Sequence, residues 1–433
     1  MKRTRQILLC ALCAVVLLTS WIVAINTKTS AERQIELMYK AGRYMQDGVY
    51  VLAVPLLEEA VTLSTRSTWA VEAELKRAYL ALINTRGYRS KYIGLLENQL
   101  KRNDAPADVF LEAANFYLSA RRTCEAFAIL IDGISRTGCE NLIQLYESHR
   151  YAYEINRVGY DYARAIYGGY AQVQKNGLWG LARLNGSLVI PIQYEQISTF
   201  YSDRAIVKRD NKIYAVDINN NRVSLFHGSA TDIGLGFAEN RIALRKNGVW
   251  HRATGDFVVG SASFEELGMY SEGYVAAKLN GRWGVISRDM AWLIPTEFDG
   301  IIKDELGRSY GQGAVFVKRD SLVHLFIDGK PSDEFYEDAK PFSNEGYAAV
   351  KRHGKWGFID RNGELKIDFT FDDALSFGQH LAAVKIDGYW GYIDIRGNVV
   401  IEPTFLDAKS FVGGSAPVLT ERGWDFITLI EFR

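Results

Sequence analysis

One short pattern recurs eight times between residue 151 and the C-terminus of this 433-residue chain. It is clearest in residues 355–360 (KWGFID) and in the next copy, residues 389–394 (YWGYID). The eight centres fall at positions 179, 214, 250, 283, 324, 356, 390 and 424, and the longest step, 41 residues, separates 283 from 324. A unit of about 35 residues cannot enclose a core alone, so neighbouring units must bury their apolar faces against each other.

Each unit is predicted to form three short strands. The first alternates apolar and polar residues, the second carries a Trp-Gly pair, and the third is a short apolar run. Asn176-Gly177 and Asp387-Gly388 are two of the pairs that separate the first strand from the second. Such pairs favour the positive φ angles of a type I′ hairpin turn. An aromatic residue followed by an acid, as at Phe371-Asp372, ends the unit.

The repeated segment resembles the WG repeat, also called the KWG repeat, of bacterial proteins. The resemblance is carried by residues 354–360 and 388–394 and extends over about 280 residues. It implies a β-rich fold and no particular reaction. Four copies depart from the pattern, and their centres are Tyr214, Trp250, His324 and Trp424. The predicted structural anchors of the repeats are Trp179, Gly180, Trp250, Trp283, Gly284, Trp356, Gly357, Trp390, Gly391 and Trp424.

Two architectures accommodate eight such units: a closed eight-bladed propeller and an open β superhelix. The ends of the repeated segment favour the propeller. The last unit stops after its second strand, whereas residues 151–158, just before the first unit, read as a third strand. That segment would complete the last unit, close the ring and remove the open sheet edges.

Residues 31–150 are predicted to form helical hairpins. Apolar residues recur at helical spacing over 31–46, 52–64, 69–84, 90–100, 107–120 and 124–135. The roughly 34-residue period of the helix pairs resembles tetratricopeptide repeats. The resemblance implies a protein-binding groove, and a rigid helical spacer is the alternative. Cys124 and Cys139 lie at opposite ends of one predicted helix, too far apart for a disulfide, and are interpreted as buried thiols.

The first 30 residues are predicted to be a membrane anchor or signal segment. Lys2, Arg3 and Arg5 precede an uncharged apolar run at residues 7–25, which is long enough to cross the hydrocarbon core of a membrane. Its basic flank would stay in the cytoplasm and place residues 31–433 outside it. The alternative is secretion after signal cleavage. Three domains are therefore expected: 1–30, the tetratricopeptide-like 31–150 and the WG-repeat 151–433.

Charge and motif content narrow the possible functions. The chain has 51 basic and 51 acidic residues, so it lacks the basic field of a nucleic-acid-binding protein, and nucleic acid is not expected as a partner. Four cysteines and six histidines show no metal-ligand spacing. Neither a phosphate loop, a dinucleotide fingerprint nor a nucleophile elbow is present. We therefore expect no catalytic residue, cofactor or metal.

Each candidate for chemistry has a structural alternative. The tryptophans could stack on sugars or peptides, but anchors between sheets are the preferred interpretation. Asp360 and Asp394 recur in register, which favours turn capping over catalysis, and residues 360–364 lack the full ligand set of a Ca²⁺ loop. Convergence of Glu239, Asp256 and Glu266 would instead indicate an enzyme. The degenerate units 2, 3 and 5 are the expected places for function, because function often breaks a repeat's local rules.

Taken together, these patterns predict a multidomain α plus all-β chain with a membrane helix, a helical-hairpin segment and eight β repeats. The predicted function is a membrane-anchored, extracytoplasmic scaffold that binds a protein or another cell-envelope partner. One alternative is a glycan-binding or glycan-processing propeller enzyme of the envelope. Another is a purely structural spacer or assembly subunit.

Overall fold

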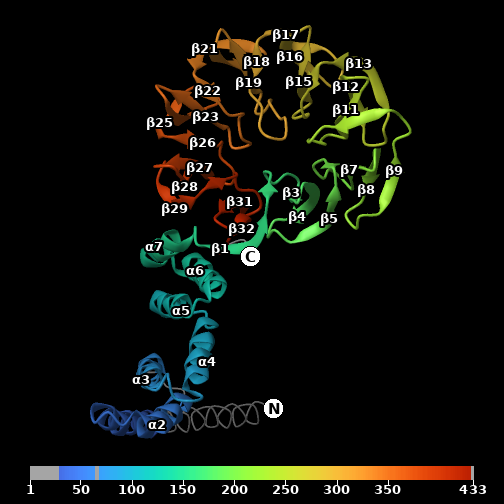
Figure 1. The fold of residues 1–433 in the computed structure, drawn as a ribbon. Coiled ribbons are helices and arrows are strands. Elements are labelled where there is room, and N and C mark those ends of the chain that lie inside the picture. Colours follow the sequence, from blue (N-terminus) through green and yellow to red (C-terminus); the bar gives the residue numbers. More distant parts are fainter. Residues whose placement is uncertain (1–28, 64–67, 431–433) are drawn as a thin grey trace, which may run out of the picture. The chain divides into compact units, whose positions relative to one another are not determined.

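The computed structural model describes residues 29–63 and 68–430 (Figure 1). These residues divide into two compact units, with the boundary between Tyr146 and Glu147. The apolar run at residues 7–25 lies outside the described residues, so the anchor or signal segment stays a prediction. Within the described ranges, no helix combines the length and the apolarity that a membrane span requires.

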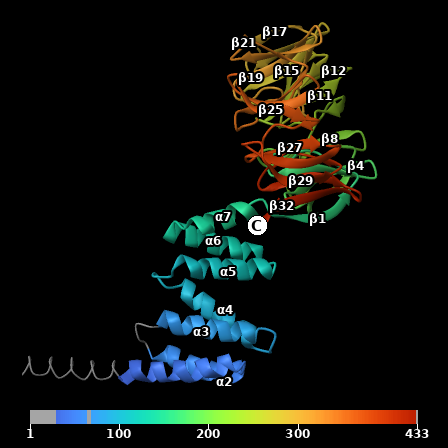
Figure 2. The same ribbon diagram turned by 90° about the vertical axis from the view of Figure 1, so that its left-hand side faces the viewer.

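The first unit is built of helices, and helices that follow each other in the chain pack together (Figure 2). Gly133 explains one close approach, because a Cβ atom there would lie 2.7 Å from the ring of Phe110 on the preceding helix. Cys124 is exposed rather than buried as predicted, because the buried face of its helix is formed by Ala126, Phe127 and Leu130. The helices span residues 29–46, α2 (Tyr50–Thr62), α3 (Thr68–Ala81), α4 (Tyr88–Leu100), α5 (Ala107–Ser119), α6 (Thr123–Thr137) and α7 (Glu140–His149).

Partly buried ion pairs tie α3 to α5 and to Arg102, which follows the end of α4. The carboxylate of Glu72, whose residue is only 1% exposed, accepts hydrogen bonds from Arg102 and from Gln99 at 2.8 Å. Lys76 pairs with Glu112, which also accepts a hydrogen bond of 2.9 Å from the hydroxyl of Tyr92. Loss of one partner would leave a buried charge uncompensated, so these pairs fix how the helices pack.

The second unit is a closed propeller, in which the described residues form eight four-stranded antiparallel sheets around one axis (Figure 1). Blade 1 comprises β2 (Tyr162–Ala163), β3 (Tyr170–Lys175), β4 (Leu178–Arg183) and β5 (Leu188–Tyr194); blade 2, β6 (Gln196–Ile197), β7 (Ala205–Arg209), β8 (Lys212–Val216) and β9 (Arg222–Leu225); blade 3, β10 (Ala230–Ile233), β11 (Arg241–Lys246), β12 (Val249–Thr254) and β13 (Val259–Phe264); blade 4, β14 (Glu266–Leu267), β15 (Tyr274–Leu279), β16 (Arg282–Ser287) and β17 (Trp292–Phe298); blade 5, β18 (Gly300–Ile301), β19 (Ala314–Arg319), β20 (Leu322–Ile327) and β21 (Lys330–Tyr336); blade 6, β22 (Asp338–Ala339), β23 (Tyr347–Arg352), β24 (Lys355–Asp360) and β25 (Leu365–Phe371); blade 7, β26 (Asp373–Ala374), β27 (Leu381–Ile386), β28 (Tyr389–Asp394) and β29 (Val399–Phe405); and blade 8, β30 (Asp407–Ala408), β31 (Ser415–Thr420), β32 (Gly423–Leu429) and β1 (Tyr153–Tyr160).

Each blade has four strands, one more than the three predicted. The additional strand is short and follows the aromatic-acidic corner directly, as in β26, where Asp373 and Ala374 pair with Lys385 and Val384. In most blades this strand has only two residues, too few to show a period, so it could not be predicted from the sequence. The predicted hairpin turns are present: Asn176 and Gly177 have φ angles of 51° and 79°, as a type I′ turn requires.

The predicted closure of the ring is confirmed. β1 pairs antiparallel with β32 and completes blade 8, with Tyr153 opposite Leu429 and Asn156 opposite Phe426. The register then shifts before Tyr160. At this irregularity the carboxylate of Asp425 accepts the N–H groups of Val158 and Gly159 at 2.8 and 2.9 Å. Asp425 is fully buried, and it fills the position that Gly occupies in other blades, so the degenerate last copy of the pattern supports closure.

The repeat frame is shifted by one residue in blades 2 and 5. Lys351 lies opposite Trp356, and in the same register Lys208 lies opposite Ile213 and Lys318 opposite Val323. Ile213 and Val323 therefore hold the tryptophan position, and the predicted centres Tyr214 and His324 were wrong. The predictions followed the largest side chain, whereas the alternation of the whole strand decides which residues are buried.

Candidate functional site

The Trp-Gly pairs lie in the core between blades. Trp283, Trp356, Trp390 and Trp424 are buried, and Trp179 and Trp250 are partly buried. Trp356 packs with Phe371 of its own blade and with Val384 and Ile393 of the next. The indoles therefore join neighbouring sheets, and their faces are not available as a continuous stacking surface.

The glycines of these pairs allow close backbone packing. A Cβ atom on Gly180 or Gly284 would lie 2.6 Å from the carbonyl oxygen of Ile190 or Ile294 on the adjacent strand, and on Gly357 it would lie 2.7 Å from that of Ile367. Gly391 is equally confined by Ile401. Side chains with a Cβ are thus excluded unless the outer strand moves, so the pair has a structural role in these blades.

The recurrent acids are engaged with backbone N–H groups. Asp360 accepts hydrogen bonds from Asn362 and Glu364 at 2.9 and 3.0 Å, and Asp394 makes the equivalent pair of contacts in the next blade. These contacts cap the turn between the second and third long strands. In the part of the chain that the structure describes, no three His, Cys, Asp or Glu residues form a group that could hold a metal ion.

The three unrepeated carboxylates are held in separate ion pairs. Glu239 pairs with Arg288 at 2.6 Å, Asp256 with Arg204 at 2.7 Å, and Glu266 with Lys278 at 3.3 Å. Since each one has a cationic partner of its own, these side chains do not form the shared carboxylate site that the enzyme alternative requires.

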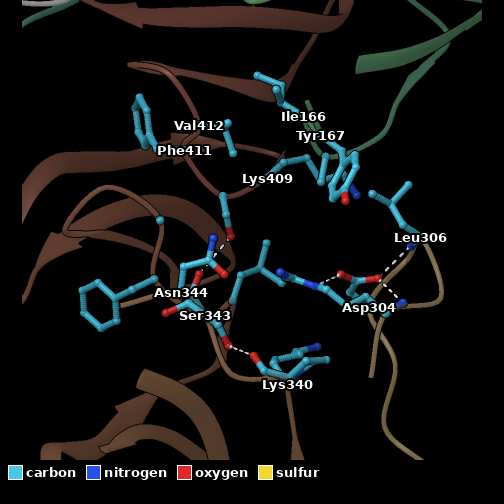
Figure 3. A pocket seen from close by; sticks show the side chains of 18 of the residues that line it. Ile166, Tyr167, Asp304, Leu306, Lys340, Ser343, Asn344, Lys409, Phe411 and Val412 are labelled. Atoms are coloured by element: carbon cyan, nitrogen blue, oxygen red, sulfur yellow. Dashed lines mark hydrogen bonds and ion pairs between the residues drawn. The ribbon is translucent and has the colours of Figure 1, made fainter. Parts of the chain in front are cut away.

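A cavity of about 680 Å³ lies within the propeller (Figure 3). Its walls are the loops that follow the short strands β2, β18, β22, β26 and β30, so blades 1, 5, 6, 7 and 8 all contribute. The loop of blade 5 is longer than its equivalents: residues 302–313 separate β18 from β19, whereas residues 375–380 separate β26 from β27 in blade 7. We call residues 303–309 the central loop.

The central loop reaches the opposite side of the ring. The carboxylate of Glu305 accepts hydrogen bonds from Lys409 of blade 8 at 2.9 Å, from the Tyr162 hydroxyl of blade 1 at 3.0 Å, and from the N–H of Ala165. The carbonyl oxygen of Gly307 accepts the N–H of Met269 in blade 4 at 2.9 Å. The loop is therefore fastened on three sides.

Leu306 and Asp304 stabilise the loop from within. Leu306 is buried against Ala238 and Met269. The carboxylate of Asp304 accepts the N–H groups of Leu306 and Arg308 and pairs with the Arg308 guanidinium at 3.0 Å (Figure 3). These contacts hold the backbone of the loop independently of Glu305.

Cations resting on aromatic rings surround the cavity. The Nζ atoms of Lys303, Lys340 and Lys409 lie 3.9, 4.8 and 4.9 Å from the ring centres of Trp283, Trp356 and Trp424. Burial lowers the pKa of Lys303. Burial is the largest influence on Lys409 and acts to lower its pKa, but Glu305, Tyr162 and Asp407 together outweigh burial, and the pKa is raised. Lys340 and Lys409 occupy equivalent places, directly after the short strands of blades 6 and 8, whereas Lys303 of blade 5 lies over the tryptophan of blade 4. The sequence pattern alone did not reveal these contacts.

The remaining walls are apolar. Ile166, Leu306, Phe377 and Phe411 are buried residues that line the cavity, and Val412 lies beside them (Figure 3). None of these residues was singled out from the sequence, because the side chains come from loops of different blades. The one signal was the long step between the predicted centres 283 and 324, within which the central loop is inserted.

Comparison with protein families finds the same repeats in the sequence. The family model described as "WG containing repeat" matches residues 159–179, 179–212, 261–283, 336–356, 356–390 and 390–424. The fold and the repeats define a repeat β-propeller preceded by a helical region. The chain is a WG beta-repeat protein. No curated protein matches the sequence significantly.

Solved structures resemble the chain at low sequence identity. Kluyveromyces lactis Hsv2p is 10% identical, over 52% of this chain and 89% of that one, with a TM-score of 0.34. A eukaryotic initiation factor is 11% identical, over 62% and 85%, with a TM-score of 0.41. The β-propeller domain of Cps50 (Swd1) from Myceliophteria thermophila is 10% identical, over 64% and 98%, with a TM-score of 0.35.

Proposed function

We propose that this chain is a membrane-anchored, extracytoplasmic scaffold whose propeller binds a protein partner at the cavity. The cavity carries this proposal. The repeated residues of the propeller are occupied in packing and turn capping, whereas the cavity is built around the unrepeated central loop and combines apolar walls with cations. Apolar walls with a few placed polar groups are typical of binding sites. A closed ring also loses little conformational freedom on binding.

The anchor rests on the sequence. The basic residues before the apolar run at 7–25 favour a cytoplasmic N-terminus and an external propeller. The helical unit lies between the anchor and the propeller in the chain and would serve as an arm. A reporter test is available: alkaline phosphatase fused to the C-terminus should be active only if that end is outside the cytoplasm. An inactive fusion would contradict the orientation, and a shortened N-terminus by mass spectrometry would indicate secretion after cleavage.

Site-specific photocrosslinking tests the binding surface. A benzophenone side chain is introduced at Asn344, an exposed residue that lines the cavity, and in a second variant at Asn362, an exposed turn residue that does not. In cells, irradiation should join the Asn344 variant to one discrete protein and leave the Asn362 control free of that product. Equal products at both positions, or none at Asn344, would contradict recognition at the cavity.

The glycan-processing alternative has less support. Glycoside hydrolysis needs a pair of available carboxyl groups that flank the bond. The acids that line the cavity already have partners: Asp304 with Arg308, Glu305 with Lys409, and Glu345 with the N–H of His380 at 2.8 Å. Each would have to leave its partner before it could act on a substrate.

A further inference from the structure

We infer that the cavity recognises an acidic, apolar segment of the partner protein, and that Glu305 occupies the carboxylate subsite when the partner is absent. The inference rests on the proposed function and names the chemistry that the same site selects. We define the carboxylate subsite as the Lys409 ammonium, the Tyr162 hydroxyl and the N–H of Ala165, the three donors that surround Glu305.

The subsite is arranged for a carboxylate. Its donors come from blades 1 and 8, whereas the carboxylate comes from blade 5, so residues far apart in the chain converge on one group. The ammonium group of Lys409 lies 5.2 Å from the ring centre of Tyr162 and 4.9 Å from that of Trp424. The two rings hold the Lys409 ammonium in place, and the N–H of Ala165 is held by the backbone itself. Charge-assisted hydrogen bonds of this kind are stronger than neutral ones.

Arg164 adds positive charge near the carboxylate subsite. The guanidinium of Arg164 lies 4.0 Å from the ring centre of Trp179 and donates a hydrogen bond of 3.1 Å to Gln172. Burial lowers the pKa of Arg164. The half-buried Arg164 guanidinium attracts the Glu305 carboxylate, so an anion is favourable here whether it belongs to Glu305 or to a ligand.

Two further cations are only loosely compensated. Lys340 lies 3.8 Å from Asp373 and Lys303 lies 3.5 Å from Glu266. Both distances exceed the 2.7–2.9 Å of a strong N–H to carboxylate contact. A second acidic group on the ligand could approach these lysines more closely. The cavity therefore has one occupied position for a carboxylate and lysines beside it that would attract another.

The apolar walls favour a peptide over an anionic polysaccharide. Ile166, Leu306 and Val412 present aliphatic carbon to the cavity and offer no hydrogen bonds to sugar hydroxyls. Unpaired hydroxyl groups would be costly there, whereas an aliphatic or aromatic side chain would be buried favourably. A peptide with an acidic residue next to an apolar residue would therefore contact Lys409 with the first and Leu306 with the second.

Exchange of one carboxylate for another explains how Glu305 can give way. Asp304, Leu306 and Gly307 hold the loop by contacts that do not involve Glu305. A ligand carboxylate would keep all three donors of the subsite satisfied, so none is left buried without an acceptor. Glu305 then acts as an internal competitor, and its removal should increase affinity for the ligand.

Selection from a random peptide library tests the inference without a known partner. Dodecapeptides displayed on phage are selected on the full-length chain, and selected peptides are measured by fluorescence anisotropy on four single variants. Glu305→Gln should bind at least about fivefold more tightly. Lys409→Gln and Lys340→Gln should each bind about tenfold or more weakly. Lys330→Gln, an exposed lysine of β21 away from the cavity, should bind like the unaltered chain.

The selected sequences should place Asp or Glu next to an aliphatic or aromatic residue. Failure to enrich any peptide, enrichment of basic peptides, or equal binding by the Lys340→Gln variant would overturn the inference. Binding of a polyuronate, with no peptide selected, would also overturn it, in favour of glycan. Thermal melting of each variant identifies any loss of fold, and Lys340→Gln has no close ion pair to lose.

The two proposals fail in different ways. If the Asn344 crosslink persists unchanged in the Lys340→Gln and Lys409→Gln variants, the scaffold function stands and the preference for an acidic segment is wrong. If no crosslink forms even in the unaltered chain, the proposed function itself is wrong.

Discussion

At the scale of single residues, the Trp-Gly pair serves two complementary purposes. The indole fills the space between one blade and the next, and the glycine lets the outer strand lie directly against the strand that carries it. The sequence predicted this anchoring role because a tryptophan that recurs at a fixed period is typical of a packing position. It could not show which side chains line the cavity, because those residues do not recur.

Trp356→Ala should destabilise the propeller by about 3–5 kcal/mol, because Trp356 is only 4% exposed and its removal leaves a cavity between blades. Urea unfolding followed by tryptophan fluorescence and circular dichroism measures the loss. Trp292→Ala is the matched control, since Trp292 is 39% exposed and should cost much less. Equal effects of the two substitutions would count against the anchoring role.

At the scale of strands and loops, the repeat was predictable and its exceptions were not. The hairpin turns and the closing strand followed from Asn-Gly pairs and from the missing third strand of the last unit. The frames of blades 2 and 5 were misjudged because a large side chain at Tyr214 or His324 outweighed the alternation in the prediction. The central loop appeared only as a longer step, since a non-periodic insertion has no pattern that predicts its path.

Asp425→Gly should weaken the closing strand, although glycine is the residue that other blades have at this position. The N–H groups of Val158 and Gly159 would lose their acceptor, at a cost of about 1–3 kcal/mol. Hydrogen exchange should increase at Val158 and Gly159 before it does in blade 6. Asp425→Asn retains an oxygen acceptor and should lose less. Unchanged exchange at both amides in the glycine variant would show that Asp425 does not hold β1.

At the scale of the whole molecule, many similar small contacts maintain the ring, and several depend on ionised carboxylates. The pKa of Asp161 is lowered from its ordinary value of 3.8 because the carboxylate accepts the N–H of Asn176 and pairs with Lys175. Hydrogen bonding to Asn221 lowers the pKa of Asp217, and hydrogen bonding to Lys355 lowers that of Asp372. Such contacts recur around the propeller, so their protonation affects several blades together.

Stability should therefore decrease in acid. Each of these carboxylates has a lower pKa in the folded than in the unfolded chain, so its contribution is complete above 3.8 and is lost as the pH falls through the folded-state value. The urea midpoint should stay level down to about pH 5 and then decline. Asp161→Asn removes one titrating group and should reduce the dependence. An identical acid profile for that variant would contradict the assignment.

The closing strand also has a consequence for biogenesis. Asn156 of β1 and Thr428 of β32 are hydrogen-bonded partners 272 residues apart in the chain. During synthesis β1 therefore stays unpaired, with its edge open, until β32 has left the ribosome after nearly all of the other blades. A ribosome that stalls or a message that is cut within the last blade would release a product with two open edges. Proteases and chaperones that bind unpaired strand edges could thus distinguish a truncated chain from a full-length one.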